Sequence, residues 1–577
     1  MKDIGKSTQQ DLRKRPILMI VLTMVAYCAF NVKAATINVT SVSALQTSIN
    51  NSVSGDIINL ANGHYTNNTL SISKSGITVQ AASPGGVFLD GNNNIVISGN
   101  SNTFSGFQFT TNNISGGLPV ESPTNAVTVT GNSNTITQLN FNGYYASKMV
   151  QLEGSNNTVS YCNFQNKPTD TTASKGGDGD MLQIIPNASK PGNNLIRYCS
   201  FQHMPGGGGD WGNECIRIGD GVYSLMISRT IVEYCYFEDT GFGDSEAISV
   251  KSRENILRYN TMNNNPEAMF CFRRGDNNVA YGNFFINSGG LRAKEANNIF
   301  CYNNYFEKSG VTGSANAVSY IYYTVNSTHV LDSLNFLHNT FVDCGNIDFG
   351  GIGATNGLWA NNIFKKSGTI FVNPNNGTTF KNNIYTGTLG ITITSGITKV
   401  DPKLALNSDG YYGLTSASPA IGAATNAYPA ILNLPGIDTL LLDIKGLVRP
   451  VSRLLKDIGC EQYNASGTVI NRPLKLSDVG PSYLKSLAGI ESPKENLNFN
   501  IQVNSANRTL VVKYILPQIS EVNLTIYNLA GLLQKTTKLI AANQQQTIDI
   551  SDLKNGIYLA RLSSDDITGN LKFLIGN

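Results

Sequence analysis

Four basic residues recur in successive stretches of the chain: Lys251, Arg273, Arg292 and Lys294. Lys251 and Arg273 are 22 residues apart, and Arg292 and Lys294 follow after about one further interval of that length. If the chain forms coils of this length, the four side chains stand beside one another on one wall. A concentrated cationic stripe of this kind suits a polyanion with regularly spaced carboxylates.

Period-two alternation predicts that these side chains point outward. If the phenylalanines on either side of Cys271 face inward, Arg273 faces solvent, and the apolar neighbours of Lys251, Arg292 and Lys294 place those side chains outward as well. Neighbouring like charges disfavour the charged form of a lysine, so the stack predicts a lowered pKa for Lys251. Lys251 is therefore the candidate general base.

Two carboxylates, Asp244 and Glu246, flank the stripe. Strict alternation would put Glu246 on the same side as the inward residue Ile248, so a bend between them is needed for Glu246 to join the stripe. A pair of carboxylates is also what a glycoside hydrolase requires. Neither residue lies in an obviously apolar pocket, and the adjacent basic residues favour elimination over hydrolysis.

The elements that must position these residues repeat along the chain. A loose unit reads Asn, any residue, an aliphatic residue and then, a few residues later, Asn or Cys, any residue and Phe. Asn134 and Asn157 are 23 residues apart, as are Asn255 and Asn278. Each unit holds short alternating strands and lacks a sustained helical period. Stacking of such coils predicts an all-β fold, a right-handed parallel β-helix with asparagine ladders at its turns. A β-propeller has units about twice as long.

Cysteines fall at one repeated position of the unit, as in Cys162, Cys199 and Cys235. We expect them to stack as small buried side chains and not to form disulfides. No Cys or His spacing typical of a zinc site occurs, and the chain has only 4 histidines.

Length and composition agree with a long repeat followed by a second domain. The chain has 577 residues, 56 glycines and 14% charged residues, which exclude one small globule, a disordered polyelectrolyte and a helical bundle. Basic residues followed by an apolar run indicate a cleaved secretory signal at 1–34, too short in its apolar part to span a bilayer. Without this segment the formal charge falls from +3 to −1.

The remaining chain divides by composition into three parts. We expect the β-helix over 35–463, a linker over 464–492 where the repeat stops, and a small C-terminal β-sandwich over 493–577 with short alternating strands.

Three motifs carry a resemblance to a known family. The segments 213–219, 246–255 and 272–276 are similar to those of polysaccharide lyase family 6, the alginate lyases and chondroitinase B. The resemblance covers most of residues 36–400. It implies β-elimination, with Lys251 as the Brønsted base and Arg273 as the acid, to give 4,5-unsaturated uronate ends.

The resemblance also implies a calcium site formed by Asn213, Asp244 and Glu246, and oxygen ligands of this type suit Ca²⁺. The chain departs from the family at Arg274, where the usual residue is histidine. Some family members neutralise the substrate carboxylate with basic residues, which Arg274 could do here, so calcium dependence stays open.

Alginate is the substrate that the resemblance favours, because it requires recognition of carboxylates alone. Dermatan or chondroitin sulfate is the alternative, with sulfate contacts from Arg253 or from the stripe, and a non-catalytic glycan-binding surface protein is a third. The residues expected to bind substrate are Arg217, Arg274, Arg292, Lys294, Tyr320 and Tyr322, the tyrosines as a stacking platform for sugar rings.

The C-terminal segments 526–531, 553–558 and 572–577 resemble the sorting domain of the type IX secretion system of Bacteroidetes. This resemblance implies a secreted or cell-surface protein that engages the secretion machinery. We expect no nucleic-acid partner and no membrane span.

Overall fold

The computed structural model describes most of the chain. The described ranges are 34–110, 125–168, 179–189, 191–204, 213–241, 245–313, 315–322, 329–351, 354–426, 428–437, 440–450, 456–485, 499–514, 522–528, 533–539, 545–563 and 568–576. The expected signal peptide lies outside these ranges except for Ala34. Within them, no helix has both the length and the apolar character needed to cross a bilayer. The chain forms two compact units, residues 1–483 and 484–577.

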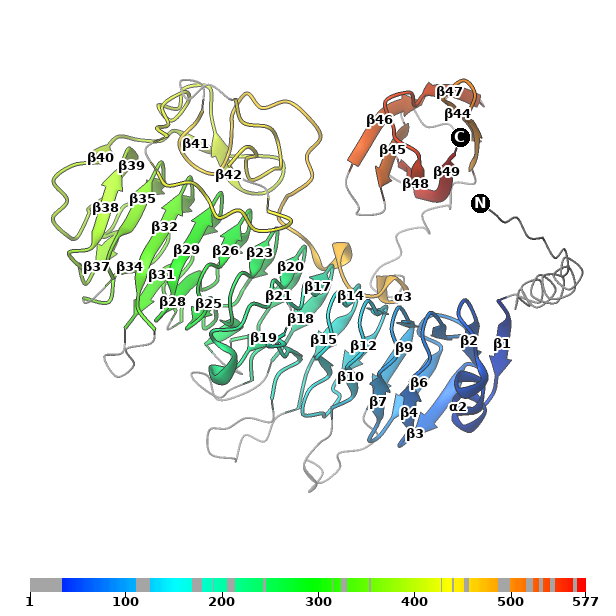
Figure 1. Cartoon of the computed structure of the whole chain (residues 1–577). Helices are drawn as coiled ribbons and strands as arrows, with labels where there is room; N and C mark the ends of the chain where they lie inside the picture. The colour runs from blue at the N-terminus through cyan, green and yellow to red at the C-terminus, as the bar shows by residue number, and fades with distance from the viewer. Residues whose placement is uncertain are drawn as a thin grey trace, which may run out of the picture. The chain divides into compact units, whose positions relative to one another are not determined.

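Three parallel sheets run along the first unit and share one hydrophobic core, which confirms the predicted parallel β-helix (Figure 1). Most coils contribute one strand to each sheet, while the stack begins with β1 (Thr36–Val39) and β2 (Ile57–Leu60) in sheet A and ends with β39 (Asn383–Tyr385) and β40 (Ile397–Lys399) in sheet B. Sheet A contains β1 (Thr36–Val39), β2 (Ile57–Leu60), β5 (Thr78–Ala81), β8 (Thr103–Ser105), β11 (Thr135–Thr137), β14 (Thr158–Ser160), β17 (Leu195–Arg197), β20 (Ile231–Glu233), β23 (Ile256–Arg258), β26 (Val279–Tyr281), β29 (Asn297–Tyr302), β32 (Asp332–Leu337), β35 (Gly357–Ala360) and β38 (Thr378–Lys381).

The other two sheets follow the same order of coils. Sheet B contains β3 (Gly63–Thr66), β6 (Val87–Asp90), β9 (Phe107–Thr110), β12 (Asn140–Asn142), β15 (Asn163–Gln165), β18 (Ser200–Gln202), β21 (Tyr236–Glu238), β24 (Thr261–Asn263), β27 (Phe284–Ile286), β30 (Tyr305–Glu307), β33 (Thr340–Val342), β36 (Ile363–Lys365), β39 (Asn383–Tyr385) and β40 (Ile397–Lys399). Sheet C contains β4 (Thr69–Ile72), β7 (Asn94–Ile97), β10 (Val127–Val129), β13 (Val150–Leu152), β16 (Leu182–Ile184), β19 (Ile216–Gly219), β22 (Glu246–Lys251), β25 (Met269–Arg273), β28 (Leu291–Lys294), β31 (Val318–Ile321), β34 (Ile347–Asp348) and β37 (Phe371–Val372).

Identical side chains stack from coil to coil because the register is maintained. The phenylalanine of the repeat forms a ladder in sheet B, with the rings of Phe164 and Phe201 parallel at 4.9 Å and those of Phe201 and Phe237 also at 4.9 Å. The turns between sheets A and B carry an asparagine ladder, in which Asn283 Nδ2 donates to Asn304 Oδ1 at 2.9 Å. The asparagines therefore satisfy buried backbone and amide groups along the axis.

The cysteines of the repeat are buried and free, as predicted. All eight cysteines in the described residues have a free thiol in the interior. The thiols of Cys162, Cys199 and Cys235 occupy successive coils.

The chain enters and leaves the coil stack in different ways. Helix α2 (Val42–Asn51) packs Leu45 and Ile49 against the first coil and is capped by Ser41, whose Oγ accepts a hydrogen bond from the backbone N–H of Ala44 at 3.2 Å. At the other end the chain leaves β40 and turns back. It contains the antiparallel pair β41 (Leu404–Leu406) and β42 (Tyr412–Leu414), the short helix η3 (Leu476–Asp478) and α3 (Ser482–Lys485).

The described residues of 401–483, which we call the return segment, run back along the outer faces of sheets A and B. Apolar side chains of the segment pack on outward residues of both sheets, among them Tyr281 and Tyr305. The segment extends to an early coil, where the backbone N–H of Ser482 donates to Gln138 Oε1 at 2.7 Å. Part of the stretch predicted as a linker, up to residue 483, thus lies along the β-helix. The linker prediction rested on composition, and composition does not reveal contacts between residues that are distant in sequence.

The second unit is a small antiparallel β structure, as expected for the C-terminal sandwich. One sheet contains β43 (Phe499–Asn504), β44 (Thr509–Tyr514) and β47 (Gln545–Asp549), and the other contains β46 (Leu533–Leu539), β45 (Val522–Asn528), β48 (Gly556–Ser563) and β49 (Thr568–Ile575). Residues of both sheets, such as Val512 and Leu562, form one core.

Candidate active site

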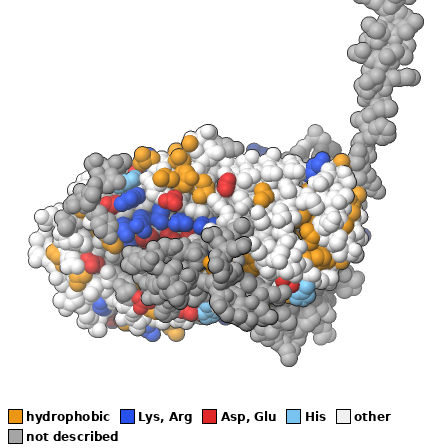
Figure 2. All heavy atoms as spheres, turned by 90° about the horizontal axis from the view of Figure 1, so that it is seen from below, with side chains coloured by type: hydrophobic (Ala, Val, Ile, Leu, Met, Phe, Trp, Pro, Cys, Tyr) orange, Lys and Arg blue, Asp and Glu red, His pale blue; other side chains and the backbone are white. Residues whose placement is uncertain are grey.

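The basic residues gather on the outer face of sheet C, over strands β19, β22, β25 and β28. Arg273 pairs in register with Lys294, and Val250 pairs with Phe272, so that Lys251 and Arg273 follow one another across the strands. The apolar residues between them belong to the core, which confirms the predicted outward orientation. Figure 2 shows Lys and Arg side chains gathered in one patch on this part of the molecule, beside acidic side chains.

A β-bulge brings Glu246 into the stripe. The register of β22 against β25 shifts between Glu246 and Ile248, which is the bend that strict alternation required. Glu246 is fully buried, and its Oε2 accepts a hydrogen bond from Ser249 Oγ at 2.5 Å. Its Oε1 lies 3.5 Å from a guanidinium nitrogen of Arg273 and 3.9 Å from one of Arg292. Glu246 thus underlies two of the four predicted cations.

Lys251 is held by a second buried carboxylate. Its Nζ donates to Glu214 Oε1 at 3.0 Å, and the two side chains are 12% and 2% exposed. Glu214 comes two residues before β19, in the coil adjacent to that of Lys251. The amine is therefore near the surface while its partner lies beneath it.

A third carboxylate, Asp180, continues the series into the preceding coil. Asp180 is fully buried and forms an ion pair with Arg217 at 2.6 Å. Burial, and then the neighbouring Glu214 carboxylate, raise the pKa of Asp180 well above its ordinary value. Burial acts in the same sense on Glu214, but Lys251, contact with the Asp180 carboxyl group and Arg217 together outweigh it and lower the pKa of Glu214. The two shifts have opposite signs, so Glu214 is the stronger acid of this pair.

Arg274 lies outside the row formed by the other basic residues. Its φ of 60° turns the chain out of β25 directly after Arg273, and its Nε donates to buried Glu295 at 2.7 Å. Arg253 and Asp276 form a parallel ion pair at 2.9 Å in the same turns. The turns that lead from sheet C to sheet A are thus tied together by ion pairs between coils.

A histidine from a later coil lies near these turns. His329 is buried, and its Nε2 is 3.2 Å from Ser224 Oγ, in the segment that follows β19. Burial, with the positive charges of Arg274 and Arg253, lowers the pKa of His329. The imidazole therefore stays neutral at pH 7 and connects two segments beside the site.

The prediction that Tyr320 stacks on sugar rings is wrong. Tyr320 pairs in register with the inward residue Ala293 and lies inside the core, where its hydroxyl accepts from Trp359 Nε1 at 3.2 Å. Tyr322 is half-buried and packs against the same core. The side chain of Tyr320 therefore reinforces the interior beneath sheet C and does not present a face to substrate.

The expected calcium ligands are only partly within the described residues. Asp244 lies outside them. Asn213 is buried, and neither its Oδ1 nor its Nδ2 has a hydrogen-bond partner among the described groups, which fits a ligand oxygen. The coil from Ile216 to Ile248 contains the helix η1 (Gly221–Tyr223), the inserted loop needed to bring Asn213 next to the coil of Glu246. No three His, Cys, Asp or Glu side chains converge in the described ranges, so a metal would depend on Asn213 and Asp244 as well as Glu246.

Asp180 and Glu214 received no role from the sequence, yet a signal for them exists. An acid stands two residues before an alternating apolar strand in three successive coils. The three stretches are Asp180-Met-Leu-Gln-Ile, Glu214-Cys-Ile-Arg-Ile and Glu246-Ala-Ile-Ser-Val. The pairing of Leu182 with Ile216 and of Ile216 with Ile248 aligns the three acids.

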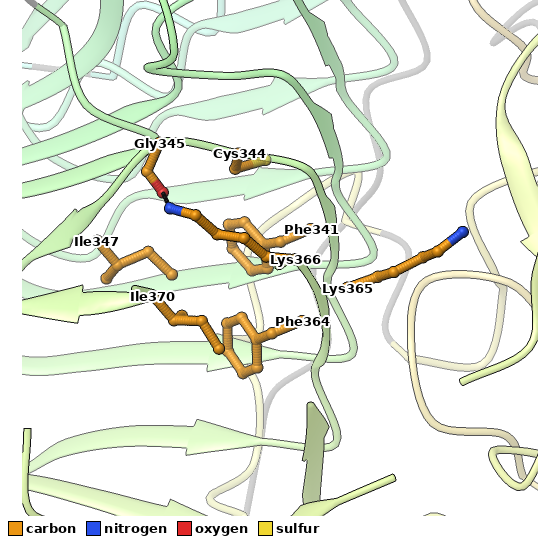
Figure 3. A pocket seen from close by; sticks show the side chains of 8 residues that line it. All are labelled: Phe341, Cys344, Gly345, Ile347, Phe364, Lys365, Lys366 and Ile370. Carbon is orange, nitrogen blue, oxygen red and sulfur yellow. Dashed lines mark hydrogen bonds between the residues drawn. The ribbon is translucent and has the colours of Figure 1, made fainter. Parts of the chain in front are cut away.

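A small pocket elsewhere in the β-helix does not compete with this site. It lies at the turns between sheets B and C of two late coils and is lined by apolar side chains such as Phe341 and Ile370 (Figure 3). Lys366 Nζ closes it by donating to the Gly345 carbonyl at 3.1 Å. The space holds about one water molecule, so no sugar ring fits.

Comparison with known families gives two matches. The model described as chondroitinase B matches residues 39–402, and the model described as a secretion system C-terminal sorting domain matches residues 496–576. A search of curated proteins finds no match.

Several solved structures share the fold of the first unit. The PL6 family alginate lyase AlyGC is 22% identical with a TM-score of 0.57, over 68% of this chain and 59% of its own. A mannuronic acid specific family 6 lyase from human gut microbiota is 22% identical with a TM-score of 0.52, over 64% and 91%. A PL6 alginate lyase in complex with a trisaccharide is 18% identical with a TM-score of 0.51, over 66% and 91%. The chain thus spans about three fifths of the length of AlyGC, and the likeness establishes a common fold.

Proposed function

The chain belongs to the chondroitinase B family, and we propose that it is a polysaccharide lyase that cleaves a uronate-containing polysaccharide by β-elimination. The observation that carries the proposal is the position of Lys251. Its amine stands at the surface of sheet C, beside Arg273 and above a buried carboxylate. An amine flanked by guanidinium groups is what removal of a proton next to a carboxylate requires.

The reaction follows from the arrangement of the row. Lys251 in its neutral form takes the proton from C5 of the uronate, and the electron pair is delocalised onto the carboxyl group. The bond between C4 and the glycosidic oxygen then breaks, C4 and C5 become doubly bonded, and Arg273 assists the departing oxygen. Arg217 and Arg292 lie in the rows beside them and would neutralise the charge that develops on the carboxylate.

Hydrolysis is the weaker alternative because of where the carboxylates lie. Glycoside hydrolases place two carboxyl groups on opposite sides of the scissile bond. Here Glu214 and Glu246 are buried under the basic side chains and engaged by them. Carboxylates in this position neutralise cations and do not face the substrate.

Alginate is the proposed substrate. The stripe offers guanidinium and ammonium groups to carboxylates, and alginate carries one carboxylate on every sugar. Dermatan or chondroitin sulfate would also need contacts to sulfate groups. Arg253 was the candidate for such a contact, but its guanidinium is already paired with Asp276. Lys294 remains a proposed substrate contact, whereas Arg274 is engaged by Glu295 in the same way as Arg253 is by Asp276.

We propose that the site binds calcium, and we assign the ion to no particular step of the reaction. Asn213, Asp244 and Glu246 would hold it, and the bound ion would neutralise the substrate carboxylate. Buried Asn213, with its unsatisfied amide, is the structural observation that supports this ligand set.

The second unit is a sorting domain, so the protein is exported to the cell surface or secreted. Polysaccharide and secretion machinery are thus the expected partners outside the cell.

One assay tests the proposed function. The protein is incubated separately with alginate, polymannuronate, polyguluronate and dermatan sulfate, while the ultraviolet absorbance of unsaturated uronate is followed. We expect absorbance to rise with alginate, to be abolished in Lys251→Ala and to persist in Lys74→Ala, a control at an exposed lysine in an early coil. New reducing ends without absorbance would indicate hydrolysis, and binding with neither signal would indicate a glycan-binding protein.

A further inference from the structure

Lys251, Arg273 and Arg292 of the stripe each lie near a buried carboxylate, and the contact made by Lys251 is the shortest of the three. Lys251 Nζ lies 3.0 Å from Glu214 Oε1, whereas a guanidinium nitrogen of Arg273 lies 3.5 Å from Glu246 Oε1. Glu246 is already engaged by Ser249 and by Arg292. Glu214 is therefore the carboxylate that faces the amine.

A lysine base needs such a partner for geometric reasons. Its terminal nitrogen sits on a flexible four-carbon stem, whereas proton removal by the neutral amine requires that nitrogen within hydrogen-bond reach of one hydrogen atom. Glu214, at 2% exposure, has little freedom to move, so its Oε1 fixes the nitrogen at one point. An unrestrained amine would spend most of its time away from the substrate.

Asp180 holds Glu214 from the opposite side. The two acids occupy aligned positions in adjacent coils, their carboxyl groups are in contact, and the backbone N–H of Met181 donates to the Glu214 carbonyl at 3.2 Å. Asp180 is itself fixed by Arg217 at 2.6 Å. The charged groups that face Glu214 are therefore Asp180, Arg217 and Lys251.

We propose that Glu214 is the positioning residue for Lys251 and that Asp180, anchored by Arg217, holds Glu214 in place. This inference rests on the proposed function of Lys251 as the base. It assigns to two buried acids a role in the turnover of the enzyme and not in the binding of substrate.

The test is a kinetic comparison of four proteins with alginate in the presence of calcium. Glu214→Gln keeps the shape of the side chain but weakens the hydrogen bond that it accepts from the Lys251 amine, and we expect kcat to fall about 100-fold because the nitrogen is misplaced. KM should stay within about threefold of the original value, because the residue does not contact substrate. The matched control is Glu233→Gln, which removes a buried carboxylate paired with Arg197 and Arg258 in sheet A, away from sheet C.

Glu214→Asp distinguishes positioning from simple neutralisation. It keeps the charge, and so keeps the ion pair available for folding, but withdraws the carboxylate by one methylene. We expect kcat to fall about tenfold at unchanged KM. A kcat equal to that of the unmodified protein in Glu214→Asp would overturn the inference, as would losses in KM alone or an equal loss of kcat in Glu233→Gln.

The outcome for the proposed function is read separately. Unsaturated product from the unmodified protein decides whether the chain is a lyase, and the ratio of the variants to it decides the role of Glu214. Thermal unfolding of each variant shows whether a loss of activity reflects loss of the folded protein. If Glu214→Gln does not fold, the result with Glu214→Asp alone decides the inference.

Discussion

Arg292 reaches over a neighbouring strand to contact Ser245. Its guanidinium donates to Ser245 Oγ at 2.9 Å, although Arg292 lies in β28 and Ser245 directly precedes β22, with β25 between them. The same group lies 3.9 Å from Glu246. A planar guanidinium with several donors suits this bridging position better than an ammonium group does.

We therefore expect Arg292→Lys to be costly although it keeps the charge. Loss of one charge-assisted hydrogen bond corresponds to about a 10- to 100-fold decrease in kcat/KM. Lyase assays over a range of alginate concentrations measure this. A matched control is Lys365→Arg, in sheet B, where the exchange should leave kcat/KM unchanged. Equal kcat/KM for Arg292→Lys and the unmodified protein would show that charge alone is needed.

Lys251→Arg should fold and yet be inactive. The guanidinium preserves a positive partner for Glu214 but does not lose its proton in the accessible pH range, so it is no base. We expect kcat to fall by about 10²- to 10⁴-fold, as measured by the absorbance of unsaturated product. Substrate binding, measured by calorimetry, should persist. Substantial turnover in this variant would exclude Lys251 as the base.

Because His338 is buried, we expect the free energy of unfolding to depend on pH. The residue is fully buried; its Nδ1 is 3.1 Å from the Asp457 carbonyl of the return segment, and its Nε2 accepts from Asn361 Nδ2 at 3.0 Å. Burial, with the charges of Arg449 and Lys456, lowers the pKa of His338 well below its ordinary value. The neutral imidazole therefore favours the folded state above the unfolded-state pKa of about 6.5, and below it about 1.4 kcal/mol is lost per pH unit until the folded-state pKa is reached.

Denaturant unfolding of the first unit between pH 5 and pH 8 measures this effect. His338→Gln supplies a neutral amide and should show a weaker loss of stability as pH falls below about 6.5. An unaltered slope in His338→Gln would mean that other groups produce the effect.

Removal of calcium should lower both activity and stability if the proposed ligand set is right. A ligand present at 100 times its Kd stabilises the folded state by about 2.7 kcal/mol, and chelation should remove this amount. Activity and thermal unfolding are measured before chelation, after it and after calcium is restored. Asn213→Ala should reproduce the chelated state. Full activity after thorough chelation would remove calcium from the proposal.

The asparagine ladder should be a principal contributor to stability. Asn283 donates to the Leu257 carbonyl and to Asn304, and it accepts from the backbone of Asn260. Asn283→Ala leaves these buried groups unpaired, at a cost of about 1–3 kcal/mol for each. Urea unfolding compares it with Asn287→Ala, whose side chain is in an exposed ladder and should cost less. An equal loss of unfolding free energy in Asn283→Ala and Asn287→Ala would show that burial of the ladder does not determine its contribution.

The sequence predicted the β-helix and the direction of the basic side chains because both depend on local periodicity. Spacing of one coil and period-two alternation fix which residues of β22 and β25 share a face. Even the bend at Glu246 followed from a conflict between its position and that of Ile248. The same alternation places Tyr320 inward, in register with Ala293. The predicted stacking on sugar rings was wrong because it did not take this direction of the side chain into account.

Other features depend on contacts that sequence spacing hides. Asp180 and Glu214 are 34 residues apart, since a loop is inserted between their aligned strands, so no constant interval connects them. The return segment has no repeat of its own, and its course is fixed by apolar side chains on the outside of distant coils. Neither relationship can be read without the registers of the sheets.

The return segment changes how the coil stack comes apart. In a solenoid each repeat contacts only its neighbours, and unfolding can begin at a terminal coil and proceed one coil at a time. Here the segment that leaves the last coil is bound near Gln138, and on the way it contacts Thr261 through the backbone N–H of Leu474. Fraying of the last coil must therefore detach a cover that spans most of the stack, so middle and end lose their protection from proteases together.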